Sequence, residues 1–250
     1  MSASYFGIQC EFDHSLVLER IEEYAASHKR GYVIALDGNN FSLAQNDSHH
    51  RDLINAAIVT HCDSSWLPIF INKIHKTNYS NYYSADLFFE LIRKKQYRHF
   101  FLGSNQRVLE SLRQSLEQYD PAIATMPFRE LPFAEVQSFE YEKIAETINR
   151  DKPDMIWVSL GCPKQEQFMQ RLQPFLNQGV MFGSGALFNF YCGLDDVPQR
   201  APKWMITHHL EFVYRICSEP KKQIPRCLRI LSVLPKALLK EKKSSTHTNS

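Results

Sequence analysis

The stretch VSLGCPKQEQF, from Val158 to Phe168, decides how the chain is expected to fold. An apolar strand runs into a glycine, a small residue and a proline, and Lys164, Gln165 and Glu166 follow at once. The turn can simply start a helix, because proline suits the first helical position and glutamate suits the helix dipole. It can instead be a ligand site, because a helix N-terminus presents unpaired backbone N–H groups.

Strand and helix patterns alternate over the rest of the chain. The expected strands are 6–12, 32–36, 59–62, 99–102, 155–160 and 180–182, and the expected helices are 15–27, one or two within 41–57, 85–95, 106–119, 139–149 and 163–172. Repeated strand, helix, strand order predicts an α/β fold with a Rossmann-like, mostly parallel sheet flanked by helices on both faces.

Ligands of such sheets bind beyond the carboxyl ends of the strands. Five residues fall there, which predicts one shared crevice: Asp37, Asp63, Gly103, Gly161 and Gly183. The two acidic residues have a structural alternative, because Asp37 can cap the following helix and Asp63 can close a turn. If the two carboxylates lie close together, the pKa of one of them rises.

Composition limits the class of protein. With 250 residues and 44% hydrophobic residues, the chain can form one large α/β domain or two small ones. No secretion signal or membrane-spanning run is visible. The six cysteines lack C-x-x-C spacing, which indicates a reducing cytoplasm and neither a zinc site nor a disulfide framework. Cys162 is expected to be a packing residue rather than a nucleophile.

Positive charge is concentrated at the C-terminal end. From Pro198 onward there are eleven Lys or Arg against three Glu, a net charge of +8, which leaves −6 for the first 197 residues. The segment 223–243 alternates basic residues with leucines, which is typical of a membrane-surface helix or of a helix that packs back on the body. We therefore expect a core at 1–197, a basic appendage at 198–243 and a disordered polar tail at 244–250.

Four motifs occur in a fixed order: VSLGCPKQEQF, MFGSGALFNFYCG (181–193), QRAPKW (199–204) and HLEFVYRICSEP (209–220). In this order they resemble the WecG/TagA/CpsF family of bacterial glycosyltransferases (glycosyltransferase family 26), over about residues 6–239. The resemblance implies an inverting, metal-independent enzyme without a cofactor, which moves a hexosyl or N-acetylhexosaminyl group from a UDP-sugar to a sugar on undecaprenyl diphosphate. It also implies a cytoplasmic enzyme docked on the anionic inner face of the cell membrane, active in cell-surface polysaccharide synthesis, with self-association and no nucleic-acid partner.

The resemblance also assigns roles to residues. Asp63, in CDSSW, matches the carboxylate proposed as general base. The departing UDP is expected to be stabilised by the helix N-terminus after Gly161 and by cationic side chains. The full set of expected substrate-binding residues is Asp37, Asn40, Asp86, Gly103, Gly161, Pro163, Gln165, Gly183, Gly185, Asn189, Arg200, Arg215, Lys222 and Arg226. Asp86 has an alternative role as a helix cap, and Lys164 and Glu166 an alternative as a solvated pair.

Some positions depart from the family pattern. Ser64 stands where a glycine follows the catalytic carboxylate, and Asn81 replaces an arginine expected to face phosphate or sugar. One alternative is therefore a catalytically weakened member that acts as a scaffold in a polysaccharide assembly complex. Another is a nucleotide-binding oxidoreductase, although no G-x-G-x-x-G sequence opens a helix. The chain also lacks the Asp-x-Asp motif by which many sugar-nucleotide enzymes bind a metal.

Overall fold

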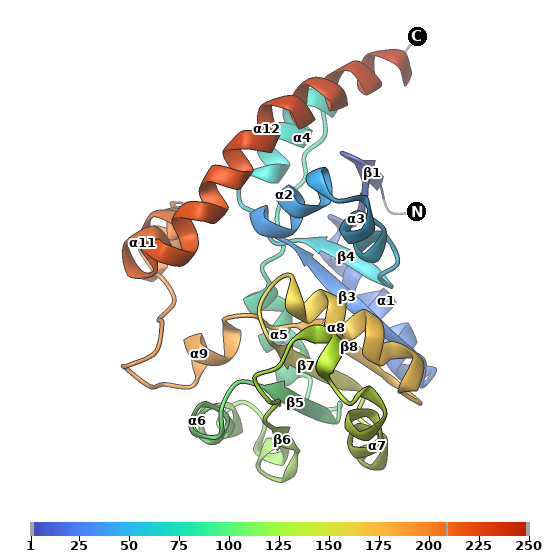
Figure 1. Cartoon of the computed structure of the whole chain (residues 1–250), viewed down its shortest axis with the longest axis vertical. Coiled ribbons are helices and arrows are strands. Elements are labelled where there is room, and N and C mark those ends of the chain that lie inside the picture. Colours follow the sequence, from blue (N-terminus) through green and yellow to red (C-terminus); the bar gives the residue numbers. More distant parts are fainter. Residues whose placement is uncertain (1–2, 209, 249–250) are drawn as a thin grey trace.

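The structure is a computed structural model that describes residues 3–208 and 210–248 (Figure 1). Within these ranges the main sheet has six strands, all parallel, in the order β4, β3, β8, β7, β5, β6. The strands are β3 (Arg30–Leu36), β4 (Val59–Cys62), β5 (His99–Gly103), β6 (Phe128–Arg129), β7 (Met155–Ser159) and β8 (Gly179–Gly183). The predicted Rossmann-like parallel sheet is confirmed.

The register of the strands brings their carboxyl ends together. Leu36 pairs with Cys62, so the residues that follow β3 and β4 lie side by side. On the other side, Val158 of β7 pairs with Gly183 of β8. Because β8 lies between β3 and β7, strands that are distant in sequence end next to each other, as at a topological switch point.

Helices cover both faces of the sheet (Figure 1). One face carries α1 (His14–Ala26), α5 (Ser84–Arg93) and α6 (Gln106–Glu117), and the other carries α3 (Ser48–Asn55), α7 (Tyr141–Asp151) and α8 (Lys164–Leu172). Strand side chains alternate between the two layers: Trp157 packs with the first set, and Ile156 and Val158 pack with the second. All three are almost fully buried, which explains the continuous apolar run in β7.

The single strand predicted at 6–12 is wrong. The structure has an antiparallel hairpin instead, β1 (Ala3–Tyr5) and β2 (Ile8–Cys10), separate from the main sheet. Phe6 and Gly7 form its two-residue turn with φ of 56° and 75°. Positive φ at both turn positions matches the twist of a hairpin, and only the glycine signals it in the sequence.

Several elements were not predicted individually. The region 41–57 contains two helices, α2 (Gly38–Asn46) and α3, and α4 (Leu67–His75) follows β4. The remaining elements are the short helices η1 (Pro121–Thr125), η2 (Val136–Ser138), η3 (Gln173–Phe175), α9 (Leu187–Tyr191), α10 (Lys203–Thr207) and α11 (Glu211–Ser218). Helix α8 begins at Lys164 rather than at Pro163, which precedes it after a cis peptide bond with Cys162.

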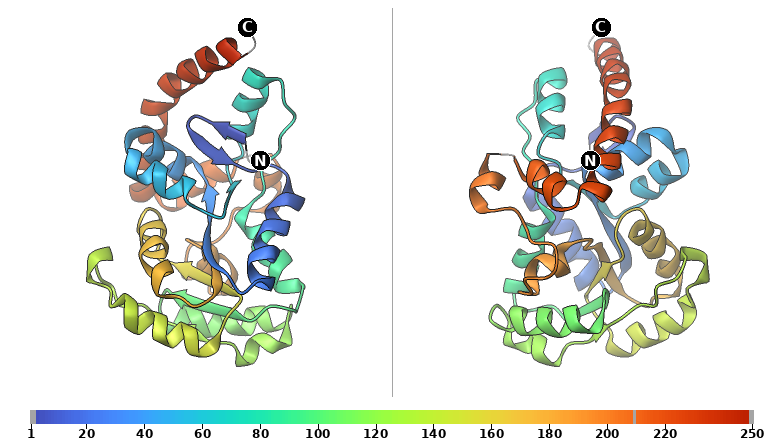
Figure 2. Two further views of the ribbon diagram at one scale, coloured as in Figure 1. Left: turned by 90° about the vertical axis from the view of Figure 1, so that its right-hand side faces the viewer. Right: turned by 60° about the vertical axis from the view of Figure 1, so that its left-hand side comes forward.

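The basic C-terminal segment forms a long helix, α12 (Pro220–Thr248), which extends past the body beside α4 and the hairpin (Figure 2). Val233 and Ala237 of α12 are buried in the same core as α2 and α4. The helix also includes residues 244–248, which were expected to belong to a disordered tail; residues 249 and 250 lie outside the described ranges. Within the part of the chain that the structure describes, no helix is long and apolar enough to cross a membrane.

Candidate active site

A cavity of about 520 Å³ lies at the carboxyl ends of β3, β4, β7 and β8, where α11 and α12 close one side. Most of the predicted site residues line it: Asp37, Asn40, Asp63, Gly161, Gln165, Gly183, Gly185, Asn189, Arg200, Arg215, Lys222 and Arg226. Asp86, Gly103 and Pro163 do not. The predicted crevice thus exists, and it combines residues from the sheet with residues from the basic C-terminal segment.

Asp63 directly follows β4 and is half-buried in this cavity. Its Oδ1 accepts a hydrogen bond of 2.8 Å from the backbone N–H of Ser84, the first residue of α5. The pKa of Asp63 is raised to about 7, chiefly by burial and also by the negative charge of Asp37, against the opposing effect of the Ser84 N–H. A carboxyl group with this pKa can accept or release a proton near neutral pH.

Asp37 directly follows β3 and has the capping role that was one of its two alternatives. Its Oδ1 accepts a hydrogen bond of 2.7 Å from the N–H of Asn40 in the first turn of α2. Asp37 also lines the cavity. Burial raises the pKa of Asp37, while the guanidinium groups of Arg226 and Arg215 counteract that rise.

Four cationic side chains line the cavity. Nη1 of Arg200 donates to the hydroxyl of Tyr191 at 2.6 Å. Glu219 lies between two of the others, because its carboxylate is 3.6 Å from Nη2 of Arg215 and 3.0 Å from Nζ of Lys222.

The fourth cation, Arg226, forms neither a hydrogen bond nor a salt bridge with any residue in the described ranges. Its positive charge lowers the pKa of the nearby Asp37 carboxyl group. Its guanidinium group is therefore free to bind an anion that enters the cavity.

Gln165 connects two turns of the cavity wall. Its Oε1 accepts hydrogen bonds from the backbone N–H groups of Gly161 (3.2 Å) and Gly185 (3.0 Å), and its Nε2 donates to Glu166 at 3.1 Å. A Cβ at position 183 would come within 2.5 Å of Nε2, which explains the glycine there. Gln165 is expected to bind substrate through its side-chain amide, but both Oε1 and Nε2 of that amide already form hydrogen bonds within the protein.

Glu166 is 2% exposed, so its interpretation as a solvated residue is wrong. Its Oε1 accepts a hydrogen bond of 3.1 Å from Nδ2 of Asn40, which also donates to the carbonyl of Ala35 at 3.0 Å. Nε2 of His50 donates to Oδ1 of Asn40 at 2.9 Å. Burial raises the pKa of Glu166. Asn40 therefore lines the cavity as part of a buried network that joins α2, α3 and α8.

The three predicted residues outside the cavity have other roles. Gly103 has φ of +101°, and a Cβ there would lie 2.5 Å from the carbonyl oxygen of Ser159; its neighbour Ser104 lines the cavity instead. Asp86 is an exposed residue inside the first turn of α5. Its alternative role as a helix cap is wrong, because the N-cap residue is Tyr83 and Asp63 bonds the helix N-terminus. Pro163 is exposed, and Cys162 lines the cavity in its place.

Sequence reasoning missed several lining residues, namely Trp66, Tyr83, Phe190, Glu211 and Phe212. Glu211 could have been found, because it precedes Arg215 by four residues and therefore shares its helix face. Its Oε1 lies 4.0 Å from Nε of Arg200.

Cys162, expected to be a packing residue, forms two hydrogen bonds in the cavity wall. Its Sγ accepts a hydrogen bond from Nδ2 of Asn39 at 3.0 Å and donates to Oδ1 of Asn40 at 3.1 Å. Burial holds the pKa of the thiol well above its usual range. In the ranges described, no group of three His, Cys, Asp or Glu side chains is placed to hold a metal ion.

A family model and two relatives of known name match this chain over most of its length. The sequence model of the "Glycosyl transferase WecG/TagA/CpsF family" matches residues 5–248. Two similar relatives, from Bacillus spizizenii W23 and Bacillus subtilis 168, are each named N-acetylglucosaminyldiphosphoundecaprenol N-acetyl-beta-D-mannosaminyltransferase. Each is 27% identical to this chain, over 89% of the chain and 84% of the relative in the first case and over 91% and 86% in the second.

Proposed function

The chain belongs to the WecG/TagA/CpsF family of glycosyl transferases, and we propose that it moves an N-acetylhexosaminyl group from a UDP-sugar to a saccharide on undecaprenyl diphosphate. The relatives support the choice of acceptor, because their name specifies an N-acetylglucosamine on diphosphoundecaprenol. The same name, which specifies transfer of an N-acetylmannosaminyl group, supports the class of sugar.

The observation that carries the proposal is the shared cavity of Asp63 and four cations. Asp63 takes the proton from the acceptor hydroxyl as its oxygen attacks the anomeric carbon. The bond from that carbon to the UDP oxygen breaks on the opposite side, and UDP leaves with the electron pair. One displacement inverts the anomeric centre, so a single base is sufficient.

The departing diphosphate requires positive charge more than it requires a proton. Arg226 lacks a partner within the described ranges, and Arg215 and Lys222 share one carboxylate between them. Backbone N–H groups at the start of α8 add partial positive charge at the adjacent turn. These groups together stabilise the charge that develops on UDP.

The exposed side chains of α12 suit binding to a membrane surface. Ile224, Leu228, Leu231 and Leu239 are 47 to 65% exposed and, at spacings of four, three and eight residues, share one helix face. Lys221, Lys236 and Lys240 are also exposed. An apolar stripe flanked by lysines suits the interface of an anionic bilayer, where the lipid acceptor is held. We therefore propose that the enzyme acts on the cytoplasmic face of the cell membrane.

Acceptor-dependent release of UDP from UDP-N-acetylhexosamines tests the function. In the Asp63→Asn variant we expect the rate to fall by about 10²- to 10⁴-fold, since it lacks the base, while UDP still binds. The control is Asp52→Asn, the same change at an exposed position of α3, and its rate should match the wild type. If Asp63→Asn remains active, Asp63 is not the base. If the wild type binds UDP but never releases it from a donor, the scaffold alternative is correct.

A further inference from the structure

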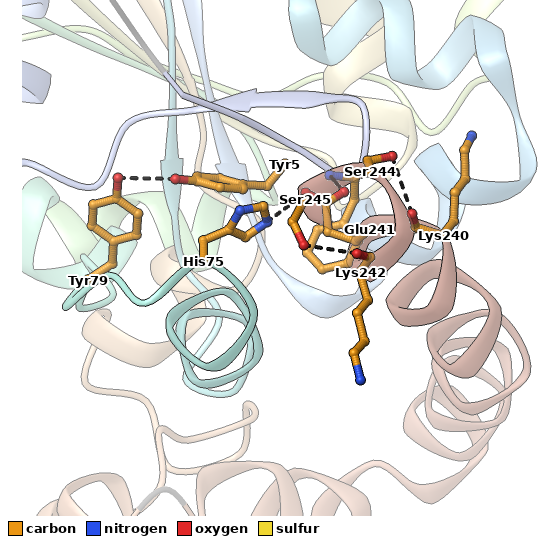
Figure 3. Close-up of polar contacts among 9 residues, drawn as sticks. Tyr5, His75, Tyr79, Lys240, Glu241, Lys242, Ser244 and Ser245 are labelled. Carbon is orange, nitrogen blue, oxygen red and sulfur yellow. Dashed lines mark hydrogen bonds and ion pairs between the residues drawn. The ribbon is translucent and has the colours of Figure 1, made fainter. Parts of the chain in front are cut away.

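Glu241 joins the end of α12 to two distant parts of the molecule (Figure 3). One carboxylate oxygen, Oε2, accepts a hydrogen bond of 2.7 Å from the backbone N–H of Phe6, in the turn of the N-terminal hairpin. The other, Oε1, is 2.9 Å from Nε2 of His75, the last residue of α4. Glu241 is only 8% exposed, so both interactions are largely shielded from water.

The surroundings of this contact are ordered by further interactions (Figure 3). The Tyr5 ring packs against His75 with a centroid distance of 4.8 Å, and its hydroxyl is 3.1 Å from that of Tyr79. On the helix side, the hydroxyls of Ser244 and Ser245 donate to backbone carbonyls one turn earlier. His75 is thus packed against Tyr5, and the serine hydrogen bonds lie within α12 beside Glu241.

The orientation of α12 depends on its contacts with the rest of the protein. Pro225 and Pro235 lie inside it, and each lacks the backbone N–H that a helix interior uses. Few of its apolar side chains are buried: Val233 and Ala237 are the ones in the core. The core therefore holds α12 near its middle, and Glu241 supplies a buried polar contact near its C-terminal end.

The other half of α12 reaches the cavity. Ile230 packs on the turn after β3, where a Cβ on Gly38 would lie 2.7 Å from its Cδ1. Nη1 of Arg229 donates to Oδ1 of Asn39 at 3.1 Å. One helical turn earlier, Arg226 lines the cavity. It lies about 22 Å along the axis from Glu241, so a small change of direction at one end displaces the other.

We propose that Glu241 is a positioning residue, whose bonds to Phe6 and His75 hold α12 so that Arg226 and Lys222 face the diphosphate of the nucleotide. This inference rests on the proposed function, because it takes UDP as the ligand. It implies that loss of Glu241 weakens the binding of the diphosphate and leaves the binding of the nucleoside unchanged.

A double-mutant cycle tests this role, with the dissociation constants of UDP and uridine measured by calorimetry. We expect Glu241→Ala to weaken UDP binding about tenfold, as Arg226→Ala does, with uridine unaffected. Glu241 is proposed to act through the cations of α12, and Arg226 is one of them. The double variant should therefore bind UDP no more weakly than the weaker-binding of the two single variants. Glu146→Ala, at an exposed position on α7, is the control and should match the wild type.

Two milder variants keep the test decisive if Glu241→Ala does not fold. His75→Ala removes one of the two bonds, and Glu241→Gln retains an oxygen for the Phe6 N–H; each should weaken UDP binding by less than tenfold and spare uridine. Folded variants with unchanged UDP affinity, equal losses for UDP and uridine, or additive effects with Arg226→Ala would overturn the proposal. If the wild type does not bind UDP, the proposed function fails as well.

Discussion

Asp63 occupies an environment that favours its neutral form. Its pKa is raised from an ordinary value of 3.8 to about 7, chiefly by burial, so the folded protein binds this proton more tightly than the unfolded chain does. The contribution of Asp63 to stability is therefore lost as pH rises from about 4 to about 7. A base suited to neutral pH is thus obtained at the expense of stability.

We expect Asp63→Asn to be more stable than the wild type at pH 8, by on the order of 2 kcal/mol, because the amide keeps an acceptor for the Ser84 N–H without a buried charge. Most of the gain should be lost at pH 4, where the aspartate is protonated in the folded protein and about half protonated in the unfolded chain. Urea unfolding at the two pH values measures this. An equal difference at both would mean that the carboxylate is not desolvated.

The sequence predicted many of the residues that line the cavity, but few of the hydrogen bonds that these residues form. The residues at the strand ends follow from strand boundaries, and Asp37, Asp63, Gly161 and Gly183 all reach the cavity. The partners of Gln165 and Glu166 could not be predicted in the same way. They depend on how α8 lies against α2 and on the turn after β8, which local patterns do not specify.

At the scale of elements, β5 and β7 approach each other closely at Gly103 and Ser159, beside the part of the cavity that Ser104 and Ser159 line. Gly103 is needed because a Cβ would lie 2.5 Å from the Ser159 carbonyl oxygen, and its φ of +101° is also unfavourable for other residues. From the sequence, Gly103 was predicted to contact a ligand. Glycine at a strand end is typical of ligand contacts and also of places where two strands approach each other closely. Only the paired register distinguishes them.

We expect Gly103→Ala to destabilise the fold by about 3 kcal/mol or more. The matched variant is Gly193→Ala, which has φ of +76° but no atom within 4 Å of the new Cβ, and it should cost only about 1 kcal/mol. Thermal or urea unfolding of the pair measures the difference. Equal losses would show that backbone conformation, and not the contact with Ser159, requires the glycine.

At the scale of the whole molecule, the C-terminal segment serves both the cavity and the surface. The charge asymmetry of the sequence indicated an anionic partner, and the helical pattern was visible from 223 to 243. The return of α12 to the N-terminal hairpin could not be predicted, because the contact joins residues 235 positions apart through a backbone N–H that has no sequence signature.

The exposed face of α12 gives the prediction for membrane binding. We expect the double variant Leu228→Asp, Leu231→Asp to bind phosphatidylglycerol vesicles at least about tenfold more weakly, because it loses apolar contact and adds negative charge. Its affinity for UDP should be unchanged. Co-sedimentation measures the effect, with Leu16→Asp, an exposed leucine on α1, as control. Binding that is insensitive to the α12 changes would place the membrane contact elsewhere.

The pH dependence of acceptor-dependent UDP release tests most directly whether Asp63 is the base of this cavity. We expect kcat/KM to rise with pH up to about 7 and then to level off, because the carboxylate must lose its proton before it can accept one from the acceptor. Asp63→Asn should remove this rise together with most of the rate. A profile that is flat from pH 5 to 8 in the wild type would contradict the assignment.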